Sequence, residues 1–303
     1  SSGRPVWPPQ AAVTAEGEGR AMNKRPLSLE VMISTLGSDG IKRVAAMTLP
    51  QMAGVSYLVS WQTVGEDSLL PEQLEARSDV RVIRTASKGL SRNRNHALDH
   101  ASADVLLIAD DDLDYIPQGL EAVRTAFEAD PDLDIGLFRY SNGYGGYEKV
   151  YPQSPVRIAG HLPKDYYTTS MEIAIRREGR SGSLRFHEEF GLGAPVLKCG
   201  EEELFLLSAR RAGHKIVLFP VDLCVHRGLT TGNRRVADRG VYRGMGAVTA
   251  LIYPLTFLPR FVLAAWRGKK RGIMKFFPAL VNFIYGAAYM ALRVRPFGRR
   301  AAD

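Results

Sequence analysis

The sequence predicts an α/β fold: a mostly parallel sheet flanked by helices, followed by a helical appendage. Over residues 27–140, short apolar runs rich in β-formers alternate with stretches of helical periodicity. Strands that alternate with helices form parallel sheets covered on both faces. Charge marks the appendage, because residues 227–303 hold 15 Lys and Arg against two Asp, a net charge of +13 in a chain whose net charge is +8.

Each predicted element follows from its local pattern. Residues 1–26 are rich in Pro, Gly and Ala and lack an apolar run, so we expect a flexible leader and no signal peptide. Strand-length runs predict strands at residues 27–35, 55–61, 80–85, 105–109, 134–140, 171–177 and 216–220. Apolar periodicity with suitable first-turn residues predicts helices at 91–101, 117–129 and 201–214. The Gly-, Tyr- and Pro-rich residues 141–170 are expected to form a long loop over a site.

Composition excludes several classes of protein. The chain has 303 residues, of which 45% are hydrophobic and 24% charged, with 29 Gly and 17 Pro. These values are ordinary for globular proteins and exclude collagen-like, coiled-coil and wholly disordered chains. The two cysteines, Cys199 and Cys224, form neither a disulfide framework nor a zinc motif, which favours a reducing, cytosolic setting.

The strongest chemical signal is the triplet Asp110, Asp111 and Asp112, directly after the apolar strand 105–109. Three adjacent carboxylates repel one another, and a divalent cation is a common way to relieve the repulsion. Open α/β sheets also bind ligands at the carboxyl ends of their strands. The alternative is a solvated acidic turn before the next helix.

Two helix starts carry weaker signals. Arg92 and Arg94 lie in the first turn of the helix at 91–101, where the helix dipole disfavours cations unless an anion binds there. The alternative is a pair of solvent-facing arginines. Glu201, Glu202 and Glu203 open the helix at 201–214, where they either complement the dipole or supply a general base.

The order of these motifs is more informative than any one of them. A strand ending in Thr35, the segment GLSRNRN at 89–95, a strand running into Asp110–Asp112, a G-E-E helix start and the late His226 follow one another. Over residues 27–229 this order resembles the family 2 inverting glycosyltransferases of the Rossmann-like GT-A fold. His226 by itself is more often structural, and it gains weight only if the fold returns it to the triplet.

The resemblance implies a role for each matching residue. Asp110 and Asp112 match the D-x-D motif that holds Mn²⁺ or Mg²⁺ on the donor, a nucleotide-diphosphate sugar, and His226 matches a histidine that can complete the metal shell. Glu202 takes the position of the catalytic base, with Glu201 and Glu203 as alternates. The donor-binding residues are then Thr35, Arg94, Asn95, Asp110 and Asp111.

One position departs from the family pattern. The second strand usually ends in an aspartate that touches the nucleoside, whereas here it ends in Ser60, Trp61 and Gln62. A UDP-sugar, the usual donor of the family, is therefore in doubt for this chain. The resemblance implies a non-processive enzyme of bacterial surface-polysaccharide or glycolipid assembly.

Residues 230–303 are expected to attach the enzyme to a membrane. Charge-free runs at 244–259 and 276–292 have 16 and 17 residues, fewer than the ~18–20 that span a bilayer, and both contain Pro. They flank a basic cluster and bear aromatic residues, a pattern typical of in-plane or re-entrant helices on an anionic leaflet. We expect a peripheral or monotopic protein on the cytoplasmic face that uses a lipid-linked saccharide acceptor. The alternative is a soluble helical cap.

Three other functions fit less well. A sugar-phosphate nucleotidyltransferase normally has a G-x-G-x-R-L segment, which residues 36–40 do not match. A nucleic-acid-binding arm is usually polar throughout, so we expect no nucleic-acid partner. A processive polysaccharide synthase would carry Q-x-x-R-W, and the comparable region holds only the arginines Arg234, Arg235, Arg239 and Arg243.

Overall fold

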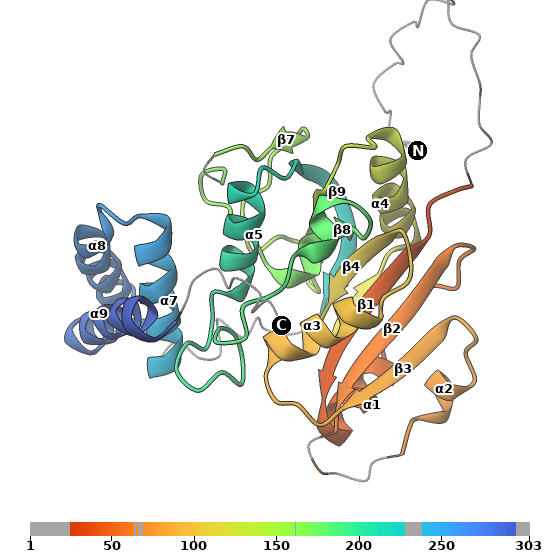
Figure 1. Ribbon diagram of the computed structural model, residues 1–303, viewed down its shortest axis with the longest axis horizontal. Coiled ribbons are helices and arrows are strands. Elements are labelled where there is room, and N and C mark those ends of the chain that lie inside the picture. Colours follow the sequence, from red (N-terminus) through yellow and green to blue (C-terminus); the bar gives the residue numbers. More distant parts are fainter. Residues whose placement is uncertain (1–24, 64, 66–68, 161, 228–237, 295–303) are drawn as a thin grey trace, which may run out of the picture.

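The computed structural model describes residues 25–63, 65, 69–160, 162–227 and 238–294 (Figure 1). Nearly all of the expected leader at 1–26 lies outside the described residues. The same holds for residues 228–237, where the boundary between the expected catalytic domain and the appendage falls.

One half of the sheet is parallel, as the sequence predicts. Its strands are β1 (Leu29–Leu36), β2 (Val55–Gln62), β3 (Val80–Thr85) and β4 (Val105–Ala109), in the spatial order β3-β2-β1-β4. Side chains of β1, β2 and β4 are almost entirely buried, because helices cover both faces of these strands. Their carboxyl ends lie at one edge of the sheet and carry the predicted site residues.

The other half of the sheet is mixed. Its strands are β5 (Leu113–Tyr115), β6 (Ile135–Asn142), β7 (Val156–Arg157), β8 (Ile173–Arg176) and β9 (Ile216–His226). β8 runs antiparallel to both β4 and β6, β9 is parallel to β6, and β5 and β7 are antiparallel to β9. The sheet thus continues beyond the predicted parallel part.

The predicted end of the last strand at residue 220 is wrong, because β9 continues to His226. Proline cannot donate a ladder hydrogen bond and is tolerated in a sheet at irregularities. The register between β6 and β9 shifts beside Pro220, between the pairs Leu137↔Leu218 and Arg139↔Asp222. The irregularity accommodates the proline, and the strand resumes toward the site.

Among the described residues, five helices accompany the sheet. They are α1 (Gly37–Ala45), α2 (Glu72–Glu75), α3 (Leu90–His100), α4 (Pro117–Ala129) and α5 (Glu201–Arg211), with 3-10 turns at Ser170–Glu172 and Arg180–Ser183. The predicted helix at 117–129 is confirmed at both ends, α3 lies within one residue of its prediction, and α5 ends three residues earlier than predicted. Positive-φ Gly200 and Gly89 are the N-caps of α5 and α3, so both site helices begin at a glycine.

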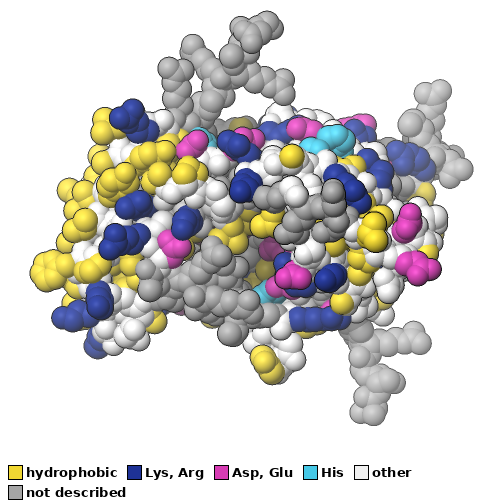
Figure 2. Space-filling view, turned by 90° about the horizontal axis from the view of Figure 1, so that it is seen from below, with side chains coloured by type: hydrophobic (Ala, Val, Ile, Leu, Met, Phe, Trp, Pro, Cys, Tyr) yellow, Lys and Arg dark blue, Asp and Glu magenta, His cyan; other side chains and the backbone are white. Residues whose placement is uncertain are grey.

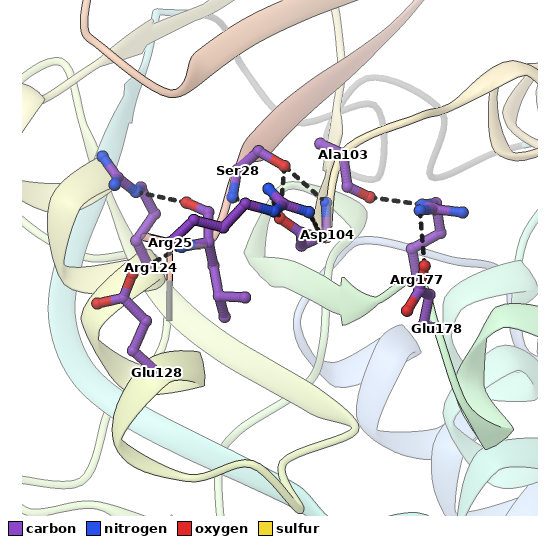
Figure 3. Close-up of polar contacts among 9 residues, drawn as sticks. Arg25, Ser28, Ala103, Asp104, Arg124, Glu128, Arg177 and Glu178 are labelled. Atoms are coloured by element: carbon purple, nitrogen blue, oxygen red, sulfur yellow. Dashed lines mark hydrogen bonds and ion pairs between the residues drawn. The ribbon is translucent and has the colours of Figure 1, made fainter. Parts of the chain in front are cut away.

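The amino-terminal edge of the sheet is fixed by polar contacts on the side away from the site (Figure 3). Asp104 accepts hydrogen bonds from the backbone N–H and hydroxyl of Ser28, at 2.8 and 2.7 Å, and pairs with Arg25. Arg177 donates to the carbonyl oxygen of Ala103. These contacts tie the starts of β1 and β4 together.

The described part of the carboxyl-terminal appendage is a bundle of three helices that lies beside α5 (Figure 1). The helices are α7 (Arg239–Ile252), α8 (Phe257–Lys270) and α9 (Phe276–Arg293). The apolar run 244–259 is not one segment as predicted, because it is interrupted between Ile252 and Phe257. Pro254 disfavours helical geometry at the preceding residue, Tyr253, which caps α7.

α7 and α9 pack closely through glycines. A Cβ on Gly286 would overlap the carbonyl oxygen of Arg243, and one on Gly246 would overlap the backbone of Phe283. Within the described residues, none of these or the other helices is both long and apolar enough to cross a membrane.

Candidate active site

The aspartate triplet sits where strand β4 ends and β5 begins. Asp112 precedes Leu113, which pairs with His226 in the antiparallel β5–β9 ladder. The imidazole Nε2 of His226 therefore lies 3.2 Å from Oδ2 of Asp112. The fold does return the late histidine to the triplet, the condition that gives it functional weight.

Asp111 is held on the β1 side of the triplet. Its carboxylate accepts a hydrogen bond of 2.6 Å from the hydroxyl of Thr35 and pairs with Arg43 at 2.8 Å. Burial raises the pKa of Asp111 despite the opposing hydrogen bonds from Arg43 and Thr35. Thr35, predicted to lie near the nucleotide, thus contacts the triplet directly.

Arg94 joins the two acidic motifs. Its guanidinium lies 2.9 Å from Asp110, 3.2 Å from Glu202 and 3.4 Å from Glu201, and its side chain is 2% exposed. Burial favours the neutral form of Arg94, but the charges of Asp110, Glu202 and Glu201 outweigh it and raise its pKa. The alternative of a solvent-facing Arg94 is wrong, and the anion at this helix start is the protein's own. Direct contact of Arg94 with the donor stays a prediction.

The three glutamates of α5 have different surroundings. The side chain of Glu201 is 6% exposed, and burial together with the charge of Glu202 raises its pKa well above the usual value. Burial and the charge of Glu202 also raise the pKa of Glu203, to about 7. Glu202 is 17% exposed and ion-paired with Arg94. Of the three, Glu202 combines access from outside with a fixed position beside the triplet.

Asn95 is hydrogen-bonded within the protein, and its predicted contact with the nucleotide stays a prediction. Its amide oxygen accepts from the backbone N–H of Phe186 at 2.8 Å, and its amide nitrogen donates to the Phe186 carbonyl at 2.9 Å and to Glu188 at 3.4 Å. Both amide hydrogens are therefore used. Asn95 fixes the chain at Phe186, whose ring packs 5.3 Å from the guanidinium carbon of Arg94.

The end of β2 is polar, and its side-chain donors are hydrogen-bonded within the protein. Gln62 is buried and donates to the hydroxyl oxygen of Ser87 and the carbonyl oxygen of Gly89. The indole N–H of Trp61 donates to the carbonyl oxygen of Gly37 at 3.0 Å. The position that would carry the family's aspartate thus supports the loop before α3.

Sequence reasoning missed a buried ion pair next to the site. Lys149 and Glu172 lie 2.7 Å apart, both side chains fully buried, and Lys149 is surrounded by the rings of Tyr140, Tyr151, Tyr166 and Tyr167. Burial lowers the pKa of Lys149, although the charge of Glu172 and, more weakly, that of Glu202 oppose it. The tyrosine-rich composition of residues 141–170 was the available signal.

The ion pair is connected to the aspartate triplet through a short turn. The hydroxyl of Ser170, two residues before Glu172, donates to Asp110 at 3.0 Å. Thr169 donates to Glu172 from both its backbone N–H and its hydroxyl. The expected long loop thus returns through this turn and contacts the site from the β6 side.

The residues present fit a divalent cation in part. Asp112 and His226 supply a carboxylate and an imidazole side by side, and the second ring nitrogen of His226 is buried with no partner among the described groups. Asp110, in contrast, is engaged by Arg94 and Ser170. No group of three potential ligand residues converges in the described part of the chain. Mg²⁺ is commonly held by one or two carboxylates together with substrate phosphates, which suits such a pair.

Comparison with known families identifies the segment that carries the triplet. The model of the family "Glycosyl transferase family 2" matches residues 67–186, which include α3, β4 and Asp110–Asp112. The chain carries a domain of glycosyl transferase family 2. Its enzyme class is therefore that of the glycosyltransferases. Curated proteins, compared by sequence, give no match.

Solved structures similar to this glycosyltransferase share its fold. A 1–349 fragment of S. aureus TarS matches with a TM-score of 0.53 and 15% identity, over 88% of this chain and 91% of that one. The same fragment in complex with UDP-GlcNAc gives a TM-score of 0.57 and 17% identity, over 86% and 82%. S. aureus TarS itself gives 0.51 and 16%, over 89% of this chain and 46% of that one. The predicted GT-A-like architecture is confirmed at the level of the fold.

Proposed function

We propose that the chain is an inverting glycosyltransferase that transfers one sugar from a nucleotide-diphosphate sugar to a hydroxyl of a lipid-linked saccharide. The observation that carries the proposal is the ion-pair cluster at Arg94. It joins Asp110, at the end of β4 in the matched family segment, to Glu202 in the first turn of α5. One guanidinium thus contacts a carboxylate proposed for the donor side of the reaction and a carboxylate proposed to accept the proton of the acceptor.

Glu202 is the proposed base. A single inverting displacement needs one group to accept the proton of the acceptor hydroxyl and requires no enzyme nucleophile. Glu201 is too deeply buried to meet an acceptor, and its raised pKa favours the neutral form. Glu202 is more exposed, and its ion pair with Arg94 fixes its position. Glu203 remains the alternate.

Asp112 and His226 are the proposed holders of Mn²⁺ or Mg²⁺, with Asp110 joining them in the predicted D-x-D arrangement. When bound, the cation supplies Lewis-acid stabilisation of the leaving diphosphate, typically several kcal/mol. The chain's own contribution is to position these side chains. Antiparallel pairing of β5 with β9 brings His226 to Asp112, and Arg94 with Ser170 orients Asp110.

A nucleotide-diphosphate sugar is the donor class that the comparisons support. A structure of the TarS fragment holds UDP-GlcNAc, and that fragment has this fold. The base of the nucleotide is a separate question, because Gln62 stands where the family's aspartate contacts the nucleoside. Thr35 and Asp111 are the remaining proposed donor contacts at the end of β1.

The three carboxyl-terminal helices are proposed to lie on the cytoplasmic face of a membrane. Figure 2 shows hydrophobic side chains at the end of the molecule formed by α8 and α9, with Lys and Arg among them. The exposed apolar residues there are Leu258, Val262, Leu263 and Trp266 on α8, and Phe277, Val281, Ile284, Tyr285 and Leu292 on α9. Apolar surface beside cations is the pattern of attachment to anionic lipid. Surface attachment would bring the enzyme to a lipid-linked acceptor.

Release of sugar from a panel of UDP-, GDP- and TDP-sugars tests the proposed function. The full chain with Mn²⁺ should hydrolyse at least one donor, and Glu202→Gln should slow the chemical step by about 10²–10⁴-fold while donor affinity stays near normal. Asp112→Asn should abolish both turnover and Mn²⁺ binding in calorimetry. The matched control is Glu203→Gln, which changes the neighbouring glutamate in the same helix turn.

Three outcomes would contradict the proposal. Full turnover in excess chelator would show that the reaction needs no divalent metal. Loss of activity in Glu203→Gln but not in Glu202→Gln would show that the base is one residue further along. Hydrolysis of no donor in the panel would remove nucleotide-sugar chemistry altogether.

A further inference from the structure

A groove of about 420 Å³ lies between α7 and α9, outside the site described above. One side is formed by Arg239 and Arg243, one turn apart on α7. The other side is formed by α9, and its lining residues are Phe277, Pro278, Val281, Asn282 and Tyr285. The groove therefore joins two guanidinium groups to an apolar wall, and its volume is in the range of small-molecule sites.

Arg243 is held in a fixed orientation. Its Nε donates to the side-chain oxygen of Asn282 at 3.0 Å, and its guanidinium carbon lies 4.3 Å above the ring of Tyr285. Asn282 is 8% exposed and donates to the carbonyl oxygen of Pro278 at 2.7 Å. A guanidinium fixed through Nε leaves its two terminal nitrogens in a set plane, the geometry that suits a phosphate or carboxylate.

Within the described part of the chain, the two arginines of the groove, Arg239 and Arg243, have no carboxylate as an ion-pair partner. The nearest acidic residue in sequence, Asp238, pairs with Lys198 and accepts from the backbone N–H of Gly240. Two adjacent arginines that repel each other are stabilised by an anion between them. The ligand of this groove is therefore expected to be anionic.

The opposite wall indicates that the anion carries an apolar chain. Phe277 is 74% exposed, Val281 63% and Tyr285 47%. They follow one another at helical spacing along α9, and Ile284 and Leu292 continue the exposed apolar face of the same helix. A free phosphate would use the arginines only, whereas an alkyl or isoprenoid phosphate would also cover the apolar wall.

The groove is connected to the helix of the proposed base. Residues 198–200 lead into α5, and this segment is bonded to the start of α7. The backbone N–H of Lys198 donates to the carbonyl oxygen of Gly240 at 3.0 Å, and the thiol of Cys199 donates to that of Val241 at 3.3 Å. Glu202 lies in the first turn of α5, directly after this segment. The start of α7, which carries both arginines, is thus hydrogen-bonded to the segment that directly precedes the helix of Glu202.

We propose that this groove binds the phosphate and adjoining apolar chain of the lipid-linked acceptor. The proposal rests on the proposed function, because it assigns a place to the lipid part of that function's acceptor. Arg239 and Arg243 bind the phosphate, and Phe277, Val281 and Tyr285 contact the first part of the chain.

Calorimetry with the full chain and three soluble probes tests the groove. The first probe, dodecyl phosphate below its critical micelle concentration, has both an anion and an alkyl chain. Dodecyl maltoside has the alkyl chain alone, and inorganic phosphate has the anion alone. Dodecyl phosphate should bind at least tenfold more tightly than either other probe. Arg239→Gln/Arg243→Gln should remove that preference, and the uncharged change Val281→Ser should weaken dodecyl phosphate but not inorganic phosphate.

A matched control separates the groove from general surface charge. Lys269→Gln/Lys270→Gln removes the same charge from α8 and should leave the preference for dodecyl phosphate intact. Equal losses in the two double variants would overturn the proposal, as would inorganic phosphate binding as tightly as dodecyl phosphate. Vesicles of phosphatidylcholine with phosphatidylglycerol test the membrane phospholipid as the source. If their binding depends on Arg239 and Arg243 more than on Lys269 and Lys270, the groove serves bulk lipid and the acceptor assignment is wrong.

The fate of this proposal can be told apart from that of the proposed function. Donor hydrolysis by the wild-type chain, without any acceptor, tests only the latter. If the protein prefers dodecyl phosphate but hydrolyses no nucleotide sugar, the glycosyl-transfer chemistry is contradicted and the anionic-lipid groove still stands. A chain that hydrolyses a donor but shows no preference among the probes would contradict the groove alone.

Discussion

The candidate active site and the carboxyl-terminal helices differ in how their cations are paired. Around the site, cations are buried against carboxylates of the same chain, as at Arg94 and Lys149. On α8 the basic residues are exposed beside exposed apolar side chains such as Trp266. The first arrangement is complete within the chain. The second leaves its cations on the surface, where the proposed membrane would meet them.

This difference determines which experiments are informative for each region. Charges buried in ion pairs contribute to stability and geometry, so their removal should be detected in unfolding. Exposed cations beside apolar surface contribute little to stability, so their removal should be detected in binding to lipid. The comparison would be contradicted if removing a buried charge left stability unchanged, or if removing an exposed cation lowered stability and left lipid binding unchanged.

The largest effect is expected at the buried pair. Lys149→Met leaves Glu172 buried without its cation and should lower the free energy of unfolding by about 3–5 kcal/mol. Chemical denaturation measures it. Lys149→Met/Glu172→Gln removes both charges and should recover most of the loss. If Lys149→Met is as stable as the wild type, the buried pair contributes no more to stability than an exposed ion pair does.

A smaller effect, on the order of 3 kcal/mol, is expected from the titration of Glu203. Its pKa is raised from the usual 4.5 to about 7, chiefly by burial and then by the charge of Glu202. The folded state then binds more protons than the unfolded state between these values, so stability should fall as the pH rises from 4.5 to 7.

Denaturation at pH 5 and at pH 7.5 measures this dependence. Glu203→Gln cannot titrate, and its unfolding free energy should fall less between the two pH values than that of the wild type. Glu201, whose pKa is also raised, contributes with the same sign in both proteins. Identical pH dependence in the two proteins would show that Glu203 titrates normally.

A substitution of Asn95 tests whether this side chain stabilises the fold or contacts the donor. Asn95→Ala leaves the backbone N–H and carbonyl of Phe186 without their partner and should cost about 1–3 kcal/mol of stability. Arg92→Ala, on the same helix, breaks only an exposed pair with Glu188 and should cost at most about 1 kcal/mol. Lost donor affinity at unchanged stability would return Asn95 to the predicted nucleotide contact.

The smallest effect is expected from a single exposed lysine. Lys270→Ala should weaken binding to anionic vesicles by about fivefold, equivalent to about 1 kcal/mol per cation near the surface. Binding to neutral vesicles and the unfolding free energy should not change. Flotation at low and high salt measures the effect. Full-length protein that stays at the bottom of the gradient at low salt would support the soluble-cap alternative.

The sequence was most informative where a structure depends on nearby residues. Pro at the first position and the apolar spacing located α4 at both ends, and the apolar run before Asp110 located β4. The family order of motifs then predicted which residues belong to one site. Thr35, Asp110–Asp112, Arg94, Glu201, Glu202 and His226 are indeed joined by hydrogen bonds or ion pairs.

What the sequence could not predict depends on residues far apart in the chain. The anion that compensates Arg94 was expected from a ligand, but it comes from carboxylates 16 and 108 positions away. The continuation of β9 past Pro220 depends on an irregular register with β6. The pairing of Lys149 with Glu172 requires the path of the whole 141–170 segment.

The glycine contact between α7 and α9 also limits how this chain can change over generations. Gly246 and Gly286 lie against backbone of the partner helix, so every larger residue there must separate the two helices. Leu258 and Val262 are 55% and 49% exposed, so exchanging either for another apolar residue disturbs less packing. Among related chains, the outward face can drift while the crossing point stays glycine, and that contrast would trace the bundle through sequences whose overall identity is low.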